Sequence, residues 1–332
     1  MADVNLLFLS VGRRVELMRL FGRAYGRLGI DGRVVGLDID PLATALQAVD
    51  VPLIVPRLDD PGFVPQLLSI CRRERIACVF PLIDPDIAVL ARNRAAIEAT
   101  GAGVAAVEAS TLGLANDKWR TTELFQRLGL PAPRSWLADA VDPDTATYPL
   151  FIKPRWGSAG VGASRVDDAD ALRYALAHVS QPIIQECLPG PEITNDVICD
   201  LQGQVAAVVS RQRIEVRWGE VAKGVTMRDE RIIDACRRVA EALPARGPIT
   251  VQCMMRGETP CFTEINARLG GGVPLADAAG VDFATWLLAQ AAGLDYALPP
   301  MGQYREGLYL TRSDTSLFLS QEQYDDIARR HL

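Results

Sequence analysis

The chain has 332 residues, a length that predicts two domains at roughly 150 residues each. Apolar residues make up 49% of it and charged residues 23%, the proportions of a globular protein. Thirty-five Lys and Arg against 41 Asp and Glu give a net charge of −6. No run of basic residues offers a face for nucleic acid, so we expect no nucleic-acid partner.

The N-terminus and the cysteines indicate the compartment. The apolar stretch 6–11 runs straight into Arg13 and Arg14, the reverse of the order in a signal peptide. No segment reaches the ~20 apolar residues that span a bilayer. The cysteines number seven without C-x-x-C spacing, and there are two histidines, which disfavours a disulfide framework, a zinc site and a Cys-His or Ser-His-Asp centre. We expect a cytoplasmic protein with no membrane partner.

The first third of the chain alternates between strand and helix patterns. Apolar runs predict strands at 5–11, 33–38, 51–55 and 77–82, and helical spacing predicts helices at 13–25, 63–74 and 86–98. This alternation predicts a doubly wound parallel sheet. The dinucleotide fingerprint G-x-G-x-x-G is absent, because Gly12 is followed by Arg13 and Arg14 where small residues would admit a pyrophosphate. An NAD-dependent enzyme is therefore a disfavoured alternative.

A domain boundary is expected near residue 115. Asn116-Asp117-Lys118 is typical of a helix cap, and the helix that follows is predicted to run through Leu128. Short apolar runs beyond Leu150 predict an α+β second half with a largely antiparallel core. Residues 301–332 are expected to form a tail of unknown role, with short strands at 308–310 and 317–318.

The segment Phe151–Gly162 combines a strand ending in Lys153 with a glycine-rich loop. Glycines let backbone N–H groups converge on an anion, and the lysine adds a positive charge. The spacing from Gly157 to Ser164 imitates a Walker A loop, but Ala163 stands where that motif needs Lys. The segment predicts a phosphate cradle, with an ordinary glycine-rich hairpin as the alternative.

The apolar run 182–186 is followed by a Pro-Gly-Pro turn, and the carboxylates on the two sides of this turn, Glu186 and Glu192, are six residues apart. A strand with a free edge can offer its backbone N–H and C=O groups to a purine, and a carboxylate beyond the turn can accept hydrogen bonds from a ribose. The pattern predicts a nucleoside clamp. Solvated turn carboxylates are the alternative.

Polar residues also interrupt two apolar strands near the end of the second half. Gln252 lies in the run 249–254, and Glu264, Asn266 and Arg268 alternate along an extended segment, which predicts that all three face the same way. Glutamate and asparagine offer the hard oxygen ligands that suit Mg²⁺, and arginine can brace a phosphate. The alternative is an amphipathic strand with a wet face.

Taken in chain order, five motifs resemble those of the ATP-grasp superfamily, in particular its carbamoyl-phosphate-synthase-like branch, over the chain to about residue 300. The motifs are Lys118, Lys153-Pro154 with its glycine loop, Gln185-Glu186-x-x-x-Gly190-x-Glu192, Gln252, and Glu264-x-Asn266-x-Arg268. The resemblance implies an α/β fold. A Rossmann-like pre-ATP-grasp domain with a parallel sheet would occupy 1–115, and a two-lobed α+β ATP-grasp module would follow, with lobe one at 116–190 and lobe two at 191–300.

The resemblance also implies a role for each residue. Gln252, Glu264 and Asn266 would hold one or two Mg²⁺, which Mn²⁺ can replace. Arg268 would stabilise the γ-phosphoryl group, and Lys223, in a looser alignment, would make a further phosphate contact. The ATP-binding residues would be Lys118, Lys153, Gly157, Ser158, Gly160, Gly162, Gln185, Glu186, Cys187, Leu188 and Glu192, with the 185–188 backbone at adenine and Glu192 at the ribose.

The implied reaction is an ATP- and Mg²⁺-dependent ligation of small molecules. A carboxylate attacks the γ-phosphate to give an acylphosphate and ADP, and an amine or thiol then displaces phosphate. Such a site needs no His, Cys or Ser nucleophile, because phosphoryl transfer depends on positioning and charge neutralisation. We do not expect carbamoyl phosphate synthesis, because the sequence shows no second grasp module and no sign of a glutaminase. A catalytically inactive nucleotide-binding regulator is the alternative function. For the assembly of the protein, a homodimer is one option.

Arg13 and Arg14 begin the first helix at the carboxyl end of the first strand, where open sheets place their ligands. They are candidates for a substrate pocket. Packing against Asp38 and Asp40 at the surface is an equal alternative. On the same edge of the sheet, Asp84 and Asp86 are expected to cap the helix that follows them.

Overall fold

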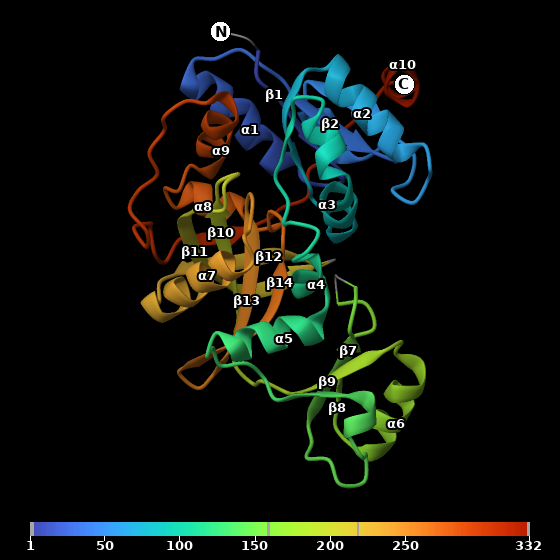
Figure 1. Ribbon diagram of the computed structural model, residues 1–332, viewed down its shortest axis with the longest axis vertical. Coiled ribbons are helices and arrows are strands. Elements are labelled where there is room, and N and C mark those ends of the chain that lie inside the picture. Colours follow the sequence, from blue (N-terminus) through green and yellow to red (C-terminus); the bar gives the residue numbers. More distant parts are fainter. Residues whose placement is uncertain (1–2, 158–159, 218, 331–332) are drawn as a thin grey trace.

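The computed structural model describes residues 3–157, 160–217 and 219–330 (Figure 1). Its N-terminal part is a five-stranded parallel sheet in the order β3-β2-β1-β4-β5. The strands are β1 (Asn5–Phe8), β2 (Val34–Asp38), β3 (Val51–Ile54), β4 (Ile76–Phe80) and β5 (Gly103–Val104), and the helices between them are α1 (Val15–Leu28), α2 (Phe63–Arg73) and α3 (Asp84–Glu98), with the short 3₁₀ helix η1 (Thr44–Ala48) before β3. The predicted parallel α/β sheet is confirmed. Strands β1, β3 and β4 end one to three residues before their predicted ends, β2 ends at its predicted residue, and β5 was not predicted.

Helix α1 illustrates why these residues adopt these elements. Leu17, Met18, Phe21 and Tyr25 recur at helical spacing and are all buried. The helix ends at Gly29, whose φ of 64° is left-handed, and the backbone N–H of Gly29 donates to Tyr25 O. The apolar face of α1 therefore covers the sheet, while its first residues face the rest of the molecule.

A second, small sheet forms a lobe of its own at the bottom of Figure 1. Its antiparallel strands run in the order β6-β9-β7-β8. They are β6 (Ser135–Leu137), β7 (Leu150–Pro154), β8 (Ser164–Val166) and β9 (Pro182–Glu186), joined by α6 (Ala169–His178) and the turn η2 (Ala138–Ala140). A separate core of six buried residues holds this small lobe together: Leu150, Ile152, Val166, Leu172, Ala175 and Ile184.

The third sheet is antiparallel and has the order β14-β13-β10-β11-β12-β15. Helix α7 packs on β10 and β11, α4 and α5 pack on β14, and α9 packs on α1 of the N-terminal part. The elements are α4 (Leu112–Asn116), α5 (Lys118–Arg127), β10 (Glu192–Cys199), β11 (Val205–Arg217), β12 (Glu220–Met227), α7 (Glu230–Ala242), β13 (Ile249–Arg256), β14 (Thr259–Asn266), α8 (Pro274–Ala278), α9 (Phe283–Ala292) and β15 (Tyr309–Thr311). Two hydrophobic clusters run without a break from the N-terminal sheet into this large sheet.

The C-terminal residues connect both large sheets. Strand β15 pairs with β12, close to the predicted strand at 308–310. The predicted strand at 317–318 is wrong, because these residues have no regular structure and a helix, α10 (Gln321–Ala328), follows them. Helix α10 packs against β3, and the N–H of Ile54 donates to Arg330 O at 3.2 Å. Within the described ranges, no helix is long and apolar enough to cross a membrane.

Candidate active site

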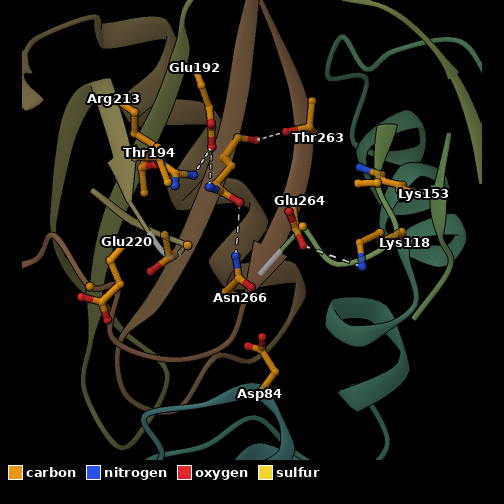
Figure 2. Close-up of a pocket in the computed structure, with 18 of the residues that line it drawn as sticks. Asp84, Lys118, Lys153, Glu192, Thr194, Arg213, Glu220, Thr263, Glu264 and Asn266 are labelled. Atoms are coloured by element: carbon orange, nitrogen blue, oxygen red, sulfur yellow. Dashed lines mark hydrogen bonds and ion pairs between the residues drawn. The ribbon is translucent and has the colours of Figure 1, made fainter. Parts of the chain in front are cut away.

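A cavity of about 910 Å³ lies where the three sheets meet. The N-terminal part contributes Arg14 and Asp84, the small lobe contributes Lys153, and the large sheet contributes Gln252 and Glu264. Figure 2 shows Lys118 and Lys153 on one side, pointing toward Glu264 on the other. Side chains far apart in the sequence thus converge on one cleft.

The two lysines of the cleft are both buried. Lys118 Nζ donates to Gly157 O at 2.6 Å and lies 3.9 Å from Glu264 Oε1. For Lys153 Nζ, no hydrogen bond or ion pair is found among the described residues, and burial lowers the pKa of this amine, against the attraction of Glu264. A buried ammonium without a fixed partner is costly, so this position suits an anionic ligand.

Asp117 fixes the start of α5 against the glycine loop. Its side chain accepts hydrogen bonds from the N–H groups of Trp119 and Arg120 and so caps the helix as predicted. Arg155 donates to both oxygens of Asp117, each at 2.7 Å. Burial alone would raise the pKa of Asp117, but these hydrogen bonds keep it below its ordinary value. The pair holds Lys118 beside the strand that carries Lys153.

The glycine loop lies over the same end of the cleft. Gly157 and Gly160 line the cavity. Gly162, whose φ is 73°, turns beneath Pro154, and a Cβ there would lie 3.0 Å from the proline ring. The left-handed backbone and the close contact with Pro154 both favour glycine at position 162. The predicted contact of Ser158 lies outside the described residues.

The predicted free edge at residues 182–186 is wrong. Strand β9 lies between β6 and β7, and Gln185 pairs with both neighbours. The Glu186 carboxylate accepts from the backbone N–H and the guanidinium of Arg134, and it also pairs with Arg256. The two residues just past the strand, Cys187 and Leu188, line the cavity.

Four side chains form a hydrogen-bonded row across β11, β10, β13 and β14. Glu192 Oε1 accepts from Arg213 Nη1 at 2.6 Å and from Gln252 Nε2 at 2.7 Å. Asn266 Nδ2 then donates to Gln252 Oε1 at 3.3 Å. Gln252 lies directly opposite Glu264 in the strand register. The row is drawn with dashed lines in Figure 2.

The chemistry of this row fits a nucleotide-bound Mg²⁺. The Glu264 carboxylate is partly exposed to the cleft, and the neighbouring amides add neutral oxygens. Mg²⁺ prefers one or two protein oxygens together with phosphate oxygens and water. Within the described ranges, no group of three His, Cys, Asp or Glu is placed to hold a metal ion. Glu264 and Asn266 would hold the ion on the protein side, with Gln252 beside them.

Arg268 departs from its predicted position. The strand ends at Asn266, so Arg268 does not continue the alternation and instead lies in the turn that follows. Its guanidinium reaches across to α3, where Nε donates to Asp84 Oδ1 at 2.8 Å. Arg268 nevertheless lines the cavity. Asp84 was expected to cap α3, but it holds this arginine.

Lys223 does not belong with the other predicted residues. It lies on β12 with its side chain half exposed, and Nζ pairs with Glu215 Oε2 at 2.7 Å. It is not among the described residues that line the cavity. Alternation along β12 turns its side chain away from the buried face, so we correct the prediction and assign Lys223 no role.

Asp86 and Arg14 organise the floor of the cleft. Asp86 accepts hydrogen bonds from the N–H groups of Leu82 and Ile83 and from the hydroxyl of Ser10, and burial raises its pKa to about 6. Arg14 Nε lies 3.3 Å from Glu220 Oε1. Of the two alternatives for Arg14, packing against Asp38 is wrong, because Arg14 pairs with Glu220 and the Asp38 carboxylate accepts from the Gly12 N–H.

Sequence reasoning missed the buried ion pair beneath the cleft. Arg211 Nε donates to Asp196 Oδ2 at 2.8 Å, with both side chains almost fully buried. A Cβ at Gly272 would lie 2.6 Å from the guanidinium carbon of Arg211, and one at Gly270 would lie 2.9 Å from Asp196 Oδ1. The run of glycines after Arg268 was a usable signal, because it marks a close approach of backbone to other groups.

Comparisons with known proteins agree with this geometry. Residues 6–105 match the PylC-like N-terminal domain, and residues 115–272 match the ATP-grasp domain. The chain is 30% identical over 223 residues to a D-alanine–D-alanine ligase of Stutzerimonas stutzeri, and this alignment covers 59% of this chain and 68% of that protein. It is 24% identical over 185 residues to the carbamoyl phosphate synthase large chain of Methanospirillum hungatei, covering 49% and 18%.

The same fold is found among solved structures. An L-amino acid ligase from Bacillus licheniformis superposes with a TM-score of 0.65 at 20% identity, over 88% of this chain and 74% of that one. The chain belongs to the ATP-grasp superfamily and carries a PylC-like N-terminal domain. It is an ADP-forming ligase of that type, as the predicted superfamily and enzyme class implied.

Proposed function

We propose that this protein joins a small carboxylate to an amine through an acylphosphate intermediate, at the expense of ATP. The observation that carries the proposal is the cleft in which Lys118 and Lys153 face Glu264 and Asn266. Two cationic groups on one wall and hard oxygens on the other are suited to a Mg²⁺-bound triphosphate. The relatives named ligases of alanine and of amino acids favour an amino acid or peptide as substrate.

In the first step, a carboxylate oxygen attacks the γ-phosphorus and the bond to the ADP oxygen breaks, with its electron pair leaving on ADP. Lys118 and Lys153 would bind the phosphates, and Arg268 would neutralise charge on the phosphoryl group in transfer. The amine then attacks the acyl carbon, phosphate leaves, and the amine nitrogen loses a proton. Mg²⁺, one ion or two, with Mn²⁺ as a substitute, would supply charge neutralisation at the phosphates when bound.

The backbone at Cys187 and Leu188 would receive adenine, and Glu192 would accept hydrogen bonds from the ribose. The glycines at 157 and 160 would close over the phosphates. We propose these ligand roles because all of these residues line the same cleft.

The test is incubation with Mg-ATP and pools of candidate acids and amines, followed by detection of ADP and phosphate. Release of both, dependent on an acid and an amine, is the expected result. Release of AMP and pyrophosphate would indicate adenylation. Tight nucleotide binding without turnover on any pool would favour the regulatory module.

A further inference from the structure

A second cavity, of about 480 Å³, adjoins the first behind the start of α1. The two cavities share lining residues, among them Arg13, Arg14 and Glu220. The far wall of the second cavity is built by the segment that follows β15, from Arg312 to Leu317. A volume of this size can hold a small metabolite. One molecule can therefore extend from the first cavity into the second.

An ion-pair bridge lies where the two cavities meet. Glu220 lies between two arginines, with Oε1 at 3.3 Å from Arg14 Nε and Oε2 at 3.0 Å from Arg312 Nη1. Arg14 is held further by the carbonyls of Leu269 and Leu82, at 3.0 and 3.1 Å. One carboxylate thus faces two guanidinium groups, which leaves the bridge positively charged.

The charge of the second cavity is opposite to that of the whole chain. Five arginines and three carboxylates line it, so that 5 − 3 gives +2, while the chain as a whole carries −6. The charged residues are Arg13, Arg14, Arg19, Arg217, Arg312, Glu16, Glu220 and Asp314. An excess of arginine in a concave site raises the local concentration of anions, and its planar group binds carboxylates and phosphates.

We propose that the second cavity binds an anionic group at the remote end of one ligation substrate. The substrate class is then an acid or amine that carries a further carboxylate or phosphate beyond the group that reacts. This inference rests on the proposed function, because the reacting end must lie near Arg268 and Glu264 in the first cavity. Arg312, which comes from the C-terminal segment, acts as a specificity residue.

The experiment measures binding at saturating Mg²⁺ and a non-hydrolysable ATP analogue. L-glutamate, glutarate and O-phospho-L-serine are titrated beside partner probes whose remote group is neutral, namely L-glutamine, glutaramate (the mono-amide) and L-serine. We expect at least one anionic probe to bind the wild-type protein at least about tenfold more tightly than its neutral partner, the size of one charge-assisted hydrogen bond. The preferred probe tells carboxylate from phosphate.

Two variants make the result specific to this cavity. Arg312→Gln should abolish the preference for the anionic probe. Thr315→Glu, which adds a negative charge to the cavity wall without touching the ion-pair bridge, should reduce it. The matched control Gln202→Glu adds the same charge on the exposed turn between β10 and β11 and should change nothing.

The inference is overturned if wild type shows no preference for any anionic probe, or if the preference survives both variants. Binding of the ATP analogue, measured first in the same titration, separates this failure from that of the proposed function. Analogue binding without anion preference removes only the second-cavity site. Loss of analogue binding would remove both.

Discussion

Asp84 in the first turn of α3 holds the guanidinium of Arg268, with Nε 2.8 Å from Oδ1 and Nη2 3.4 Å from Oδ2, although the two residues are 184 positions apart. The contact joins the N-terminal sheet to the turn after β14. Both side chains are largely buried. The arginine is therefore aimed into the cleft by a residue that lies outside the ATP-grasp match.

Asp84→Asn should lower ligase turnover by about tenfold or more at saturating ATP, because the neutral amide cannot fix the charged guanidinium. The dissociation constant for Mg-ATP should stay within about twofold, since the phosphate-binding lysines are untouched. ADP release and nucleotide titration measure the two effects separately. Asp139→Asn, on an exposed turn, is the control. Equal losses in turnover and in nucleotide affinity would contradict the positioning role.

Glu264→Gln should reduce turnover by at least about a hundredfold, because it removes the only carboxylate among the three proposed metal ligands, Gln252, Glu264 and Asn266. The melting temperature should change little, since the contact of Glu264 with the buried Lys118 is long, at 3.9 Å, and glutamine has nearly the same size and shape as glutamate. Glu258→Gln, on the exposed turn between β13 and β14, is the control. Retained turnover would contradict the metal assignment.

Lys153→Met should weaken nucleotide binding by about 10- to 100-fold, the range expected for loss of a hydrogen bond to a charged group. The stability of the nucleotide-free protein should be unchanged or higher, because burial already disfavours the charged form of Lys153. Calorimetric titration with Mg-ADP and thermal unfolding without nucleotide measure both. A drop in stability together with unchanged affinity would contradict the phosphate cradle.

The raised pKa of the Asp86 carboxyl predicts that the stability of the protein depends on pH. Its pKa in the folded protein is about 6, against an ordinary value of 3.8, so the folded state binds more protons than the unfolded state between these values. Stability should therefore fall as the pH rises from about 4 to 6, by on the order of 3 kcal/mol. Asp86→Asn should flatten this slope in urea unfolding at several pH values, whereas the exposed control Asp59→Asn should keep it.

Gly272→Ala should destabilise the fold by about 2 kcal/mol or more, because its Cβ would lie 2.6 Å from the Arg211 guanidinium carbon and the buried Arg211–Asp196 pair has no room to move. Gly26→Ala is the matched control. Gly26 lies in α1 with open space around it, so alanine there should stabilise by about 0.5–1 kcal/mol. Equal effects in chemical denaturation would refute the proposed crowding.

Patterns with a short period gave the most accurate predictions. The alternating strands and helices of residues 5–104 and the shared location of Glu264 and Asn266 in the cleft follow from local periodicity, which one stretch of sequence contains. Helix α10 could also have been found, because Ser320 and Gln323 form a capping box at its start.

Contacts between distant segments were beyond local reasoning. The partner of Arg268 comes from α3, and that of Arg14 comes from β12. The pairing of β9 on both edges depends on β6, which lies about fifty residues earlier in the chain. Such relationships are set by sheet order and tertiary packing, which a single sequence does not encode in any local pattern.

The division of the hydrophobic core determines which part of the molecule can move. The N-terminal and large sheets share continuous apolar packing, and the C-terminal segment straps them together through β15 and α10. The small lobe has only its own six-residue core. Opening and closing around a nucleotide would therefore move the small lobe as a rigid body relative to the two larger sheets. Lys153 would move with the small lobe, while Glu264 would stay in place.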